Sequence, residues 1–227
     1  MLKEDDTMSI RNRLPAAALL ALATIATLSA CKTKGEIVVD EGIGVTAIRS
    51  RCPAIGIPDY TGDMTLFRSA GSKLADDIDV VAVMTNVRSE CSESSDKILA
   101  TANFEVLARR SDARGARQVS LPYFVTVLRG GSSVVSKRVG SVTVSFADGQ
   151  ERASANAQGS AYIDRVAATL PEDIRRRLTR KRKAGDADAA IDPFADPEVK
   201  AALARASFEM LVGFQLDQDQ LAYNATR

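Results

Sequence analysis

The chain has 227 residues and a formal net charge of +1, and it contains no histidine and no tryptophan. This length is enough for one domain with a sizeable core. The nearly balanced charge gives no general attraction to nucleic acid or to anionic surfaces. Without histidine, the serine–histidine and cysteine–histidine pairs of common hydrolases are excluded.

An apolar run, Leu14–Ala30, follows Arg11 and Arg13 near the start of the chain. A basic start, an apolar segment of moderate length and small residues at its end indicate an export signal. Because a membrane span needs about 20 apolar residues, an uncleaved anchor is the weaker alternative. Met8 gives a more basic start than Met1, whose first residues carry three acids.

The apolar run ends in "LSAC", Leu28–Cys31. This sequence resembles the lipobox of bacterial lipoproteins. The resemblance implies that the Cys31 thiol receives a diacylglycerol, that the chain is cut before Cys31, and that the new amino terminus is acylated. Two or more acyl chains anchor a protein stably, since each buried CH₂ contributes about 0.8 kcal/mol. An ordinary signal peptide followed by a chance cysteine is the alternative.

Lipoproteins of this type go to the outer membrane unless an acidic residue follows the cysteine. Lys32 follows it here, so the resemblance implies a lipid-anchored protein of the cell envelope, in the outer membrane and facing the periplasm. We divide the chain into a signal peptide (1–30), an anchor and spacer (31–50) and a β-domain (51–227). A first edge strand around Ile37–Val39 is the alternative interpretation of the spacer.

Two further cysteines remain if Cys31 carries lipid. In an oxidising periplasm, Cys52 and Cys91 are expected to form a disulfide, which would stabilise the fold by about 3–4 kcal/mol in the chain-entropy model. The alternative is a pair of buried free thiols.

The body of the chain alternates apolar and polar residues with a period of two, which is typical of half-buried strands. Gly- and Asp-containing turns separate these segments. We therefore expect a mainly β fold: a single antiparallel, immunoglobulin-like β-sandwich, although the missing tryptophan and the cysteine spacing argue against a true immunoglobulin domain. Pro122 predicts that its strand lies at an edge or is bulged. The expected strands are Asp79–Val87, Thr101–Arg109, Val119–Leu128, Gly140–Phe146 and Phe208–Leu216.

A helical insertion, residues 171–206, interrupts this pattern before the last strand. Pro171 is expected to begin a first helix and Gly185 to stop it. Asp196, followed by a proline and a glutamate, predicts a second helix start. Near the carboxyl end, Asp217 is expected to cap a last helical turn.

The insertion contains a dense basic run that is a candidate site for an anionic ligand. An acidic tract follows it, so a solvated helix neutralised by that tract is the favoured alternative. The tract comprises Asp186, Asp188, Asp192, Asp196 and Glu198. The candidate basic residues are Arg175, Arg176, Arg177, Arg180, Lys181, Arg182 and Lys183.

A second resemblance covers most of the region from Cys52 to Asn224. The segments "LPYFVTVL" and "GFQLDQDQLAYN", with Cys52-Pro53 and Cys91 upstream, resemble a family of uncharacterised alphaproteobacterial lipoproteins. The resemblance implies a lipoprotein and no particular activity.

We find no pattern for a cofactor, a metal site or catalysis. Ser94 and Lys97 match the catalytic serine–lysine motif S-x-x-K, but they lie in a polar loop and the two accompanying motifs are absent. We expect a non-enzymatic envelope lipoprotein with a structural, assembly or partner-binding role, held at the membrane by lipid and not binding nucleic acid. The alternative is a module that binds lipid head groups, lipopolysaccharide or acidic glycans through the basic run; an envelope hydrolase is the least favoured hypothesis.

Overall fold

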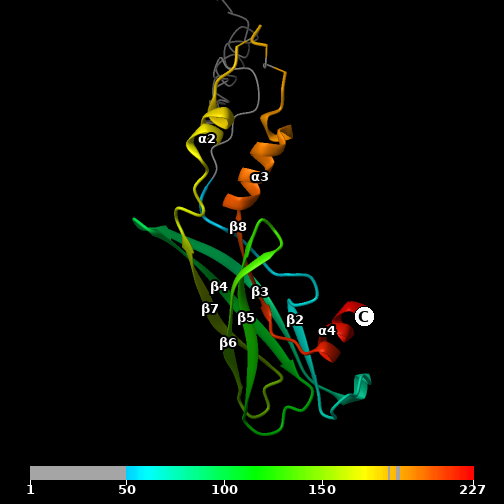
Figure 1. Cartoon of the computed structure of the whole chain (residues 1–227). Helices are drawn as coiled ribbons and strands as arrows, with labels where there is room; N and C mark the ends of the chain where they lie inside the picture. Colours follow the sequence, from blue (N-terminus) through cyan, green and yellow to red (C-terminus); the bar gives the residue numbers. More distant parts are fainter. Residues whose placement is uncertain (1–49, 184, 188–189) are drawn as a thin grey trace, which may run out of the picture. The chain divides into compact units, whose positions relative to one another are not determined.

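Two four-stranded β-sheets form the body of the protein in the computed structural model, which describes residues 50–183, 185–187 and 190–227 (Figure 1). The first sheet has the order β1-β8-β5-β6 and the second the order β2-β3-β4-β7. All the strand pairs are antiparallel except β1 with β8. The strands are β1 (Ala54–Gly56), β2 (Asp63–Phe67), β3 (Ile78–Glu93), β4 (Lys97–Arg110), β5 (Arg117–Arg129), β6 (Ser133–Phe146), β7 (Arg152–Asp164) and β8 (Phe208–Phe214).

Two α-helices and a short 3₁₀ helix lie between β7 and β8, and Figure 1 labels the two α-helices α2 and α3. The predicted helical insertion before the last strand is therefore confirmed. The helices are η1 (Ala75–Asp77), α2 (Glu172–Thr179), η2 (Pro193–Ala195), α3 (Pro197–Ala206) and α4 (Gln218–Thr226).

The inner faces of both sheets meet in one hydrophobic core, as the alternating pattern predicts. In β4, every second side chain from Ile98 to Ala108 is buried. In β8, Phe208, Met210, Val212 and Phe214 are buried in the same way. The mainly β, sandwich-like fold expected from the sequence is confirmed.

Strand β7 was not expected from the sequence because its core-facing residues are small. Ala153, Ala155, Ala157, Gly159 and Ala161 lie at alternate positions, and alanine and glycine are weak strand formers. The opposite sheet explains the choice of residue at Gly159: a Cβ atom there would lie 2.3 Å from Cγ2 of Val125. Close approach of the two sheets therefore selects small residues along β7.

The prediction that Pro122 marks an edge strand or a bulge is wrong. Strand β5 lies between β6 and β8, and its only register shift falls farther along, between Val127 and Leu128. The carbonyl of Pro122 accepts a hydrogen bond from the Gln215 amide, just past the end of β8. A residue's N–H and C=O point to the same side of an antiparallel strand, so the missing N–H would face Gln215 and not β6. The β5–β6 ladder therefore loses no bond, and on the other side β8 has already ended at Phe214.

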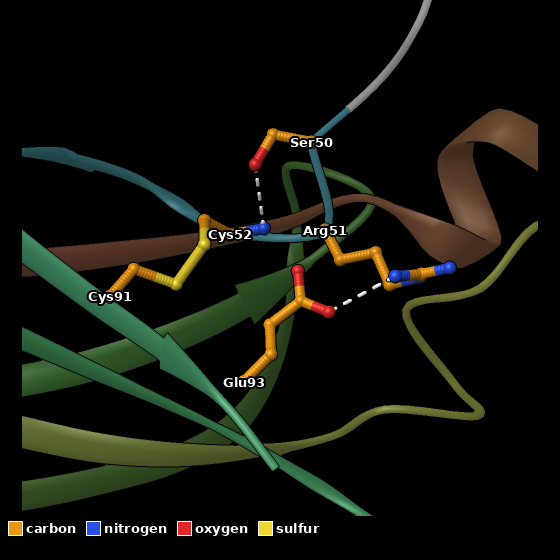
Figure 2. Close-up of a disulfide and its surroundings, with 5 residues drawn as sticks. All are labelled: Ser50, Arg51, Cys52, Cys91 and Glu93. Atoms are coloured by element: carbon orange, nitrogen blue, oxygen red, sulfur yellow. Dashed lines mark hydrogen bonds and ion pairs between the residues drawn. A yellow bond between two sulfur atoms is a disulfide. The ribbon is translucent and has the colours of Figure 1, made fainter. Parts of the chain in front are cut away.

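A disulfide between Cys52 and Cys91 links the two sheets (Figure 2). Cys52 precedes β1 of the first sheet, and Cys91 belongs to β3 of the second, with 6.1 Å between their Cα atoms. An ion pair of 3.0 Å between Arg51 and Glu93 lies beside it. The predicted disulfide is confirmed, and it joins segments 39 residues apart in the chain.

A buried arginine, Arg110, connects two of the loops through which the chain passes between the sheets. Only 1% of its surface is exposed, and its guanidinium also packs over the Phe146 ring. Its N–H groups donate to four backbone carbonyls at 2.6–2.8 Å, two in the β4–β5 loop and two in the β6–β7 turn. These carbonyls belong to Ala113, Gly115, Ala147 and Gln150.

Helix α4 is fixed on β2 by polar contacts. Asp217 caps the helix as predicted, in a capping box with Gln220. The buried Asn224 side chain donates to the carbonyls of Tyr60 and Asp63 at 2.8 and 2.9 Å. The C-terminal segment thereby covers one edge of the second sheet.

We predict that Arg110→Met lowers the free energy of unfolding by about 3–5 kcal/mol, because removal of a buried charged partner leaves several carbonyls unsatisfied. Urea unfolding measures the change. The matched control is Arg109→Met, whose side chain is 66% exposed and should change stability by less than about 0.5 kcal/mol. Equal effects of the two substitutions would contradict the role given to Arg110.

Asp79 of β3 forms an ion pair with Arg117 of β5, between the two sheets. The Arg117 guanidinium donates two hydrogen bonds to the carboxylate and holds the pKa of Asp79 below its ordinary value of 3.8. A depressed carboxyl pKa stabilises the fold above the unfolded-state pKa, and this stabilisation is lost as the pH falls through the folded-state pKa.

The stability advantage of the natural protein over Asp79→Asn should therefore shrink as the pH is lowered from neutral to about 2. Urea midpoints at several pH values measure it, with the substitution of the exposed Asp59 by Asn as control. A constant difference across this range would refute the assignment.

Candidate anion-binding site

The helical insertion has a hydrophobic cluster of its own. Helix α2 contributes its two buried residues, Ile174 and Leu178, and α3 contributes Val199 and Ala202. This spacing places the arginines of α2 away from the cluster, where their guanidinium groups reach the surface. The two buried apolar residues of α2 therefore set the direction in which its arginines point.

The first helix ends earlier than the sequence predicts. Helix α2 begins after Pro171, as expected, but it stops at Thr179 rather than at Gly185. Arg180 is in an extended conformation with φ −65° and ψ 123°. In a further helical turn, Arg177 and Lys181 would be four residues apart and Arg180 and Lys183 three apart, and such like-charged neighbours destabilise a helix.

Two aspartates begin the elements that face the basic segment. The Asp192 side chain accepts from the Phe194 amide and caps η2. The Asp196 side chain accepts from the Glu198 amide and caps α3, which confirms the predicted second helix start. Both carboxylates are thus engaged in holding backbone amides.

Acidic residues pair with much of the basic run. Arg177 lies 2.8 Å from Glu198 and 3.5 Å from Asp196, and the hydrogen bond to Glu198 raises the pKa of Arg177 above its ordinary value. Arg180 lies 3.9 Å from Asp186. Partial neutralisation by the acidic tract is therefore observed, while Asp188 of that tract lies outside the described residues.

Glu172, at the start of α2, forms ion pairs with two further basic residues. Its carboxylate lies 2.6 Å from Arg175 and 3.6 Å from Arg176. The spacing of three and four residues along a helix is the signal from which these pairs follow.

Four of the seven predicted basic residues surround one hollow of about 290 Å³ between α2 and the segment that leads into α3. The other three, Arg175, Lys181 and Lys183, do not line it. Arg182 is 5% exposed, and its Nη2 donates to the carbonyl of Arg177 at 3.5 Å. The hollow is lined by Arg176, Arg177, Arg180, Arg182, Ile191, Asp192, Pro193, Asp196 and Val199.

The described lining of the hollow carries four guanidinium groups and two carboxylates. Arg176, Arg177 and Arg180 also form ion pairs with acidic residues around it, so an anion would have to compete with these side chains. Guanidinium groups bind phosphate and carboxylate oxygens through paired, charge-assisted hydrogen bonds. The arrangement can therefore hold a phosphate or carboxylate group, with the apolar side chains of Ile191 and Val199 beside it.

Ser94 and Lys97 form a turn between β3 and β4. The Ser94 hydroxyl donates to the Lys97 carbonyl at 2.9 Å, and the Lys97 ammonium lies 5.8 Å from the centre of the Tyr162 ring. Both side chains therefore have structural contacts in this turn, and neither contact joins the Ser94 hydroxyl to the Lys97 ammonium.

The predicted lipidation residue, Cys31, and the signal and spacer segments up to residue 49 lie outside the described residues. Among the residues that the structure describes, no cluster of three or more cysteine, aspartate or glutamate side chains is arranged to hold a metal ion. No helix in that same part of the chain is long and apolar enough to cross a bilayer. Comparisons with protein-family models, curated proteins and solved structures find no match.

We predict that Arg176→Gln combined with Arg180→Gln weakens the binding of inorganic pyrophosphate at least tenfold, because each lost charged hydrogen bond is worth about 1.5–3 kcal/mol. Isothermal titration calorimetry measures it, and added salt should weaken the natural protein's binding. Arg175→Gln is the matched control, since Arg175 is bound to Glu172 outside the hollow. Unchanged binding in the double variant would rule the hollow out.

Proposed function

We propose that this protein is a lipid-anchored component of a bacterial cell envelope with a non-catalytic structural, assembly or partner-binding role. The observation that carries the proposal is the Cys52–Cys91 disulfide between the sheets. Structural disulfides persist in oxidising compartments such as the periplasm and are rare in the cytosol. The disulfide therefore supports export, to which the apolar run and "LSAC" independently point.

The proposed anchor is Cys31, carrying acyl chains after removal of residues 1–30. Several acyl chains would hold the domain at a membrane permanently. Lys32 favours the outer membrane by resemblance, with the domain facing the periplasm. No nucleic acid is expected as a partner in that location.

A binding role fits the chemistry of the side chains better than an enzymatic one. The sequence lacks histidine, the usual general base near neutral pH. Asp79, near the start of β3 and close in the sequence to Asp76 and Asp77, forms an ion pair with Arg117 between the sheets. Rigid sheets that carry exposed loops and an inserted helical segment are typical scaffolds for recognition.

The arginine-lined hollow favours a second candidate function. A domain held at a membrane meets lipid head groups, lipopolysaccharide phosphates and acidic glycans, all of which carry anionic oxygens. Four convergent guanidinium groups suit these groups through bidentate hydrogen bonds. In this alternative, the protein is a binding module for anionic envelope components.

We predict that the mature protein, purified from membranes, has an intact mass that begins at Cys31 with acyl chains added. The mass should rise by about two daltons on reduction, as the Cys52–Cys91 bond takes up two hydrogens. Mass spectrometry with and without reductant measures both. The Cys31→Ser variant is the control and should lose the acyl chains and leave the membrane fraction.

A mature mass without lipid would contradict the anchor. The partner-binding role is tested on the same membranes by chemical cross-linking of the natural protein. A specific envelope partner is the expected product, and its absence under every condition would count against that role.

A further inference from the structure

Strand β3 contains a bulge that exposes an asparagine on the outer face of the second sheet. Thr85 pairs with Glu105 and Arg88 with Asn103, so β3 has one extra residue between these pairs. Asn86 in the bulge has a φ of 52°, a left-handed conformation that non-glycine residues rarely adopt. Bulges occur often beside binding sites, where they redirect a side chain.

The register of the sheet brings further amide side chains to the same place. Asn103 of β4 pairs with Arg88 on one side and with Gln158 of β7 on the other. Asn156 lies one outer position farther along β7, opposite Glu105. These residues are far apart in the sequence, and only strand pairing makes them neighbours.

Asparagine is an unfavourable residue in strands. Three of the five asparagines in the whole chain nevertheless line one hollow on this sheet, and Gln158 joins them. Residues that break local preference without improving packing are expected at functional sites. Asn86 suits the left-handed bulge, and Asn103 is hydrogen-bonded to Glu90. No such local contact explains Asn156 and Gln158, which points to a function for the group.

The hollow has a volume of about 370 Å³, and its walls combine polar side chains with the apolar residues Phe104 and Ala157. Within the described part of the chain, no hydrogen bond engages the side chains of Asn86, Asn156 or Gln158. Asn103 donates to Glu90 at 2.9 Å through its Nδ2. Each free carboxamide offers an acceptor oxygen and two N–H donors to a ligand.

The hollow carries little charge, so hydrogen bonding rather than charge attraction would hold a ligand there. Arg88 is the one charged side chain among its described lining residues. Glu90 follows two positions later on the same strand face and is hydrogen-bonded to Asn103. A site with several amides and little net charge suits a neutral ligand rich in hydrogen-bond donors and acceptors.

We propose that this hollow is a binding site for an uncharged saccharide. Sugar hydroxyls both donate and accept hydrogen bonds, and acetamido groups pair with carboxamides, so the four amides match this chemistry. The site is separate from the arginine-lined hollow and goes beyond the proposed function.

An exposed tyrosine extends the site along β7. Tyr162 is 62% exposed and lies on the same outer face as Gln158, four residues away. At about 3.3 Å per residue, the two side chains are about 13 Å apart. An aromatic ring presents an apolar surface to a sugar ring, so a short oligosaccharide would contact both ends.

The position of the hollow argues against a peptide strand as the ligand. Peptides that bind sheets by strand addition use an exposed sheet edge. Although β7 is an edge strand, the hollow extends over the face of β3, β4 and β7 rather than along that edge alone. Side chains, rather than backbone groups of an edge, make the contacts here.

The test uses the full chain, with the tetramer of N-acetylglucosamine and maltotetraose as probes, in isothermal titration calorimetry. The natural protein should bind at least one probe at millimolar concentration or below. The combined variant Asn86→Gly, Asn156→Ala and Gln158→Ala should bind it at least tenfold more weakly. Glycine retains the positive φ at position 86.

The matched control is Gln118→Ala, which removes an exposed carboxamide from β5 of the other sheet and should leave binding unchanged. If thermal unfolding shows that the combined variant is destabilised, Gln158→Ala alone should still weaken binding. The proposal is overturned if the natural protein binds neither oligosaccharide, or if its binding survives in both variants.

Discussion

The guanidinium of Arg110 is the contact on which the closure of the sandwich depends. The chain passes from the second sheet to the first after β4, and it returns after β6. The Arg110 side chain is buried and donates hydrogen bonds to carbonyls of both connecting segments. These carbonyls are therefore satisfied by one side chain instead of by water.

The disulfide complements Arg110 by joining the sheets at a different point. Cys52 fixes the start of the short, parallel β1, which pairs with β8 over only three residues. A strand this short contributes few ladder hydrogen bonds, so a covalent link compensates for weak pairing. Neither Arg110 nor the disulfide occupies the hollow of the helical insertion or the hollow on the outer face of the second sheet.

The two candidate binding surfaces use different chemistry on this scaffold. The helical insertion concentrates guanidinium groups, three of them in ion pairs, around one hollow. The outer face of the second sheet concentrates neutral amides around a bulge. Hydrogen bonds from charged groups raise the affinity for anions. Several hydrogen bonds from uncharged amides instead favour uncharged polar ligands over those that cannot form them.

The sequence by itself determined the sandwich class, the helical insertion and the cysteine pair, because alternation, helix caps and cysteine count are local or compositional signals. It missed β7, whose alanines and Gly159 are small only because the other sheet approaches them. It misjudged Pro122, whose tolerance depends on where β8 ends. Tertiary structure alone decided which arginines share a hollow and that Asn86, Asn103 and Asn156 meet, since strand register and loop packing join residues distant in the chain.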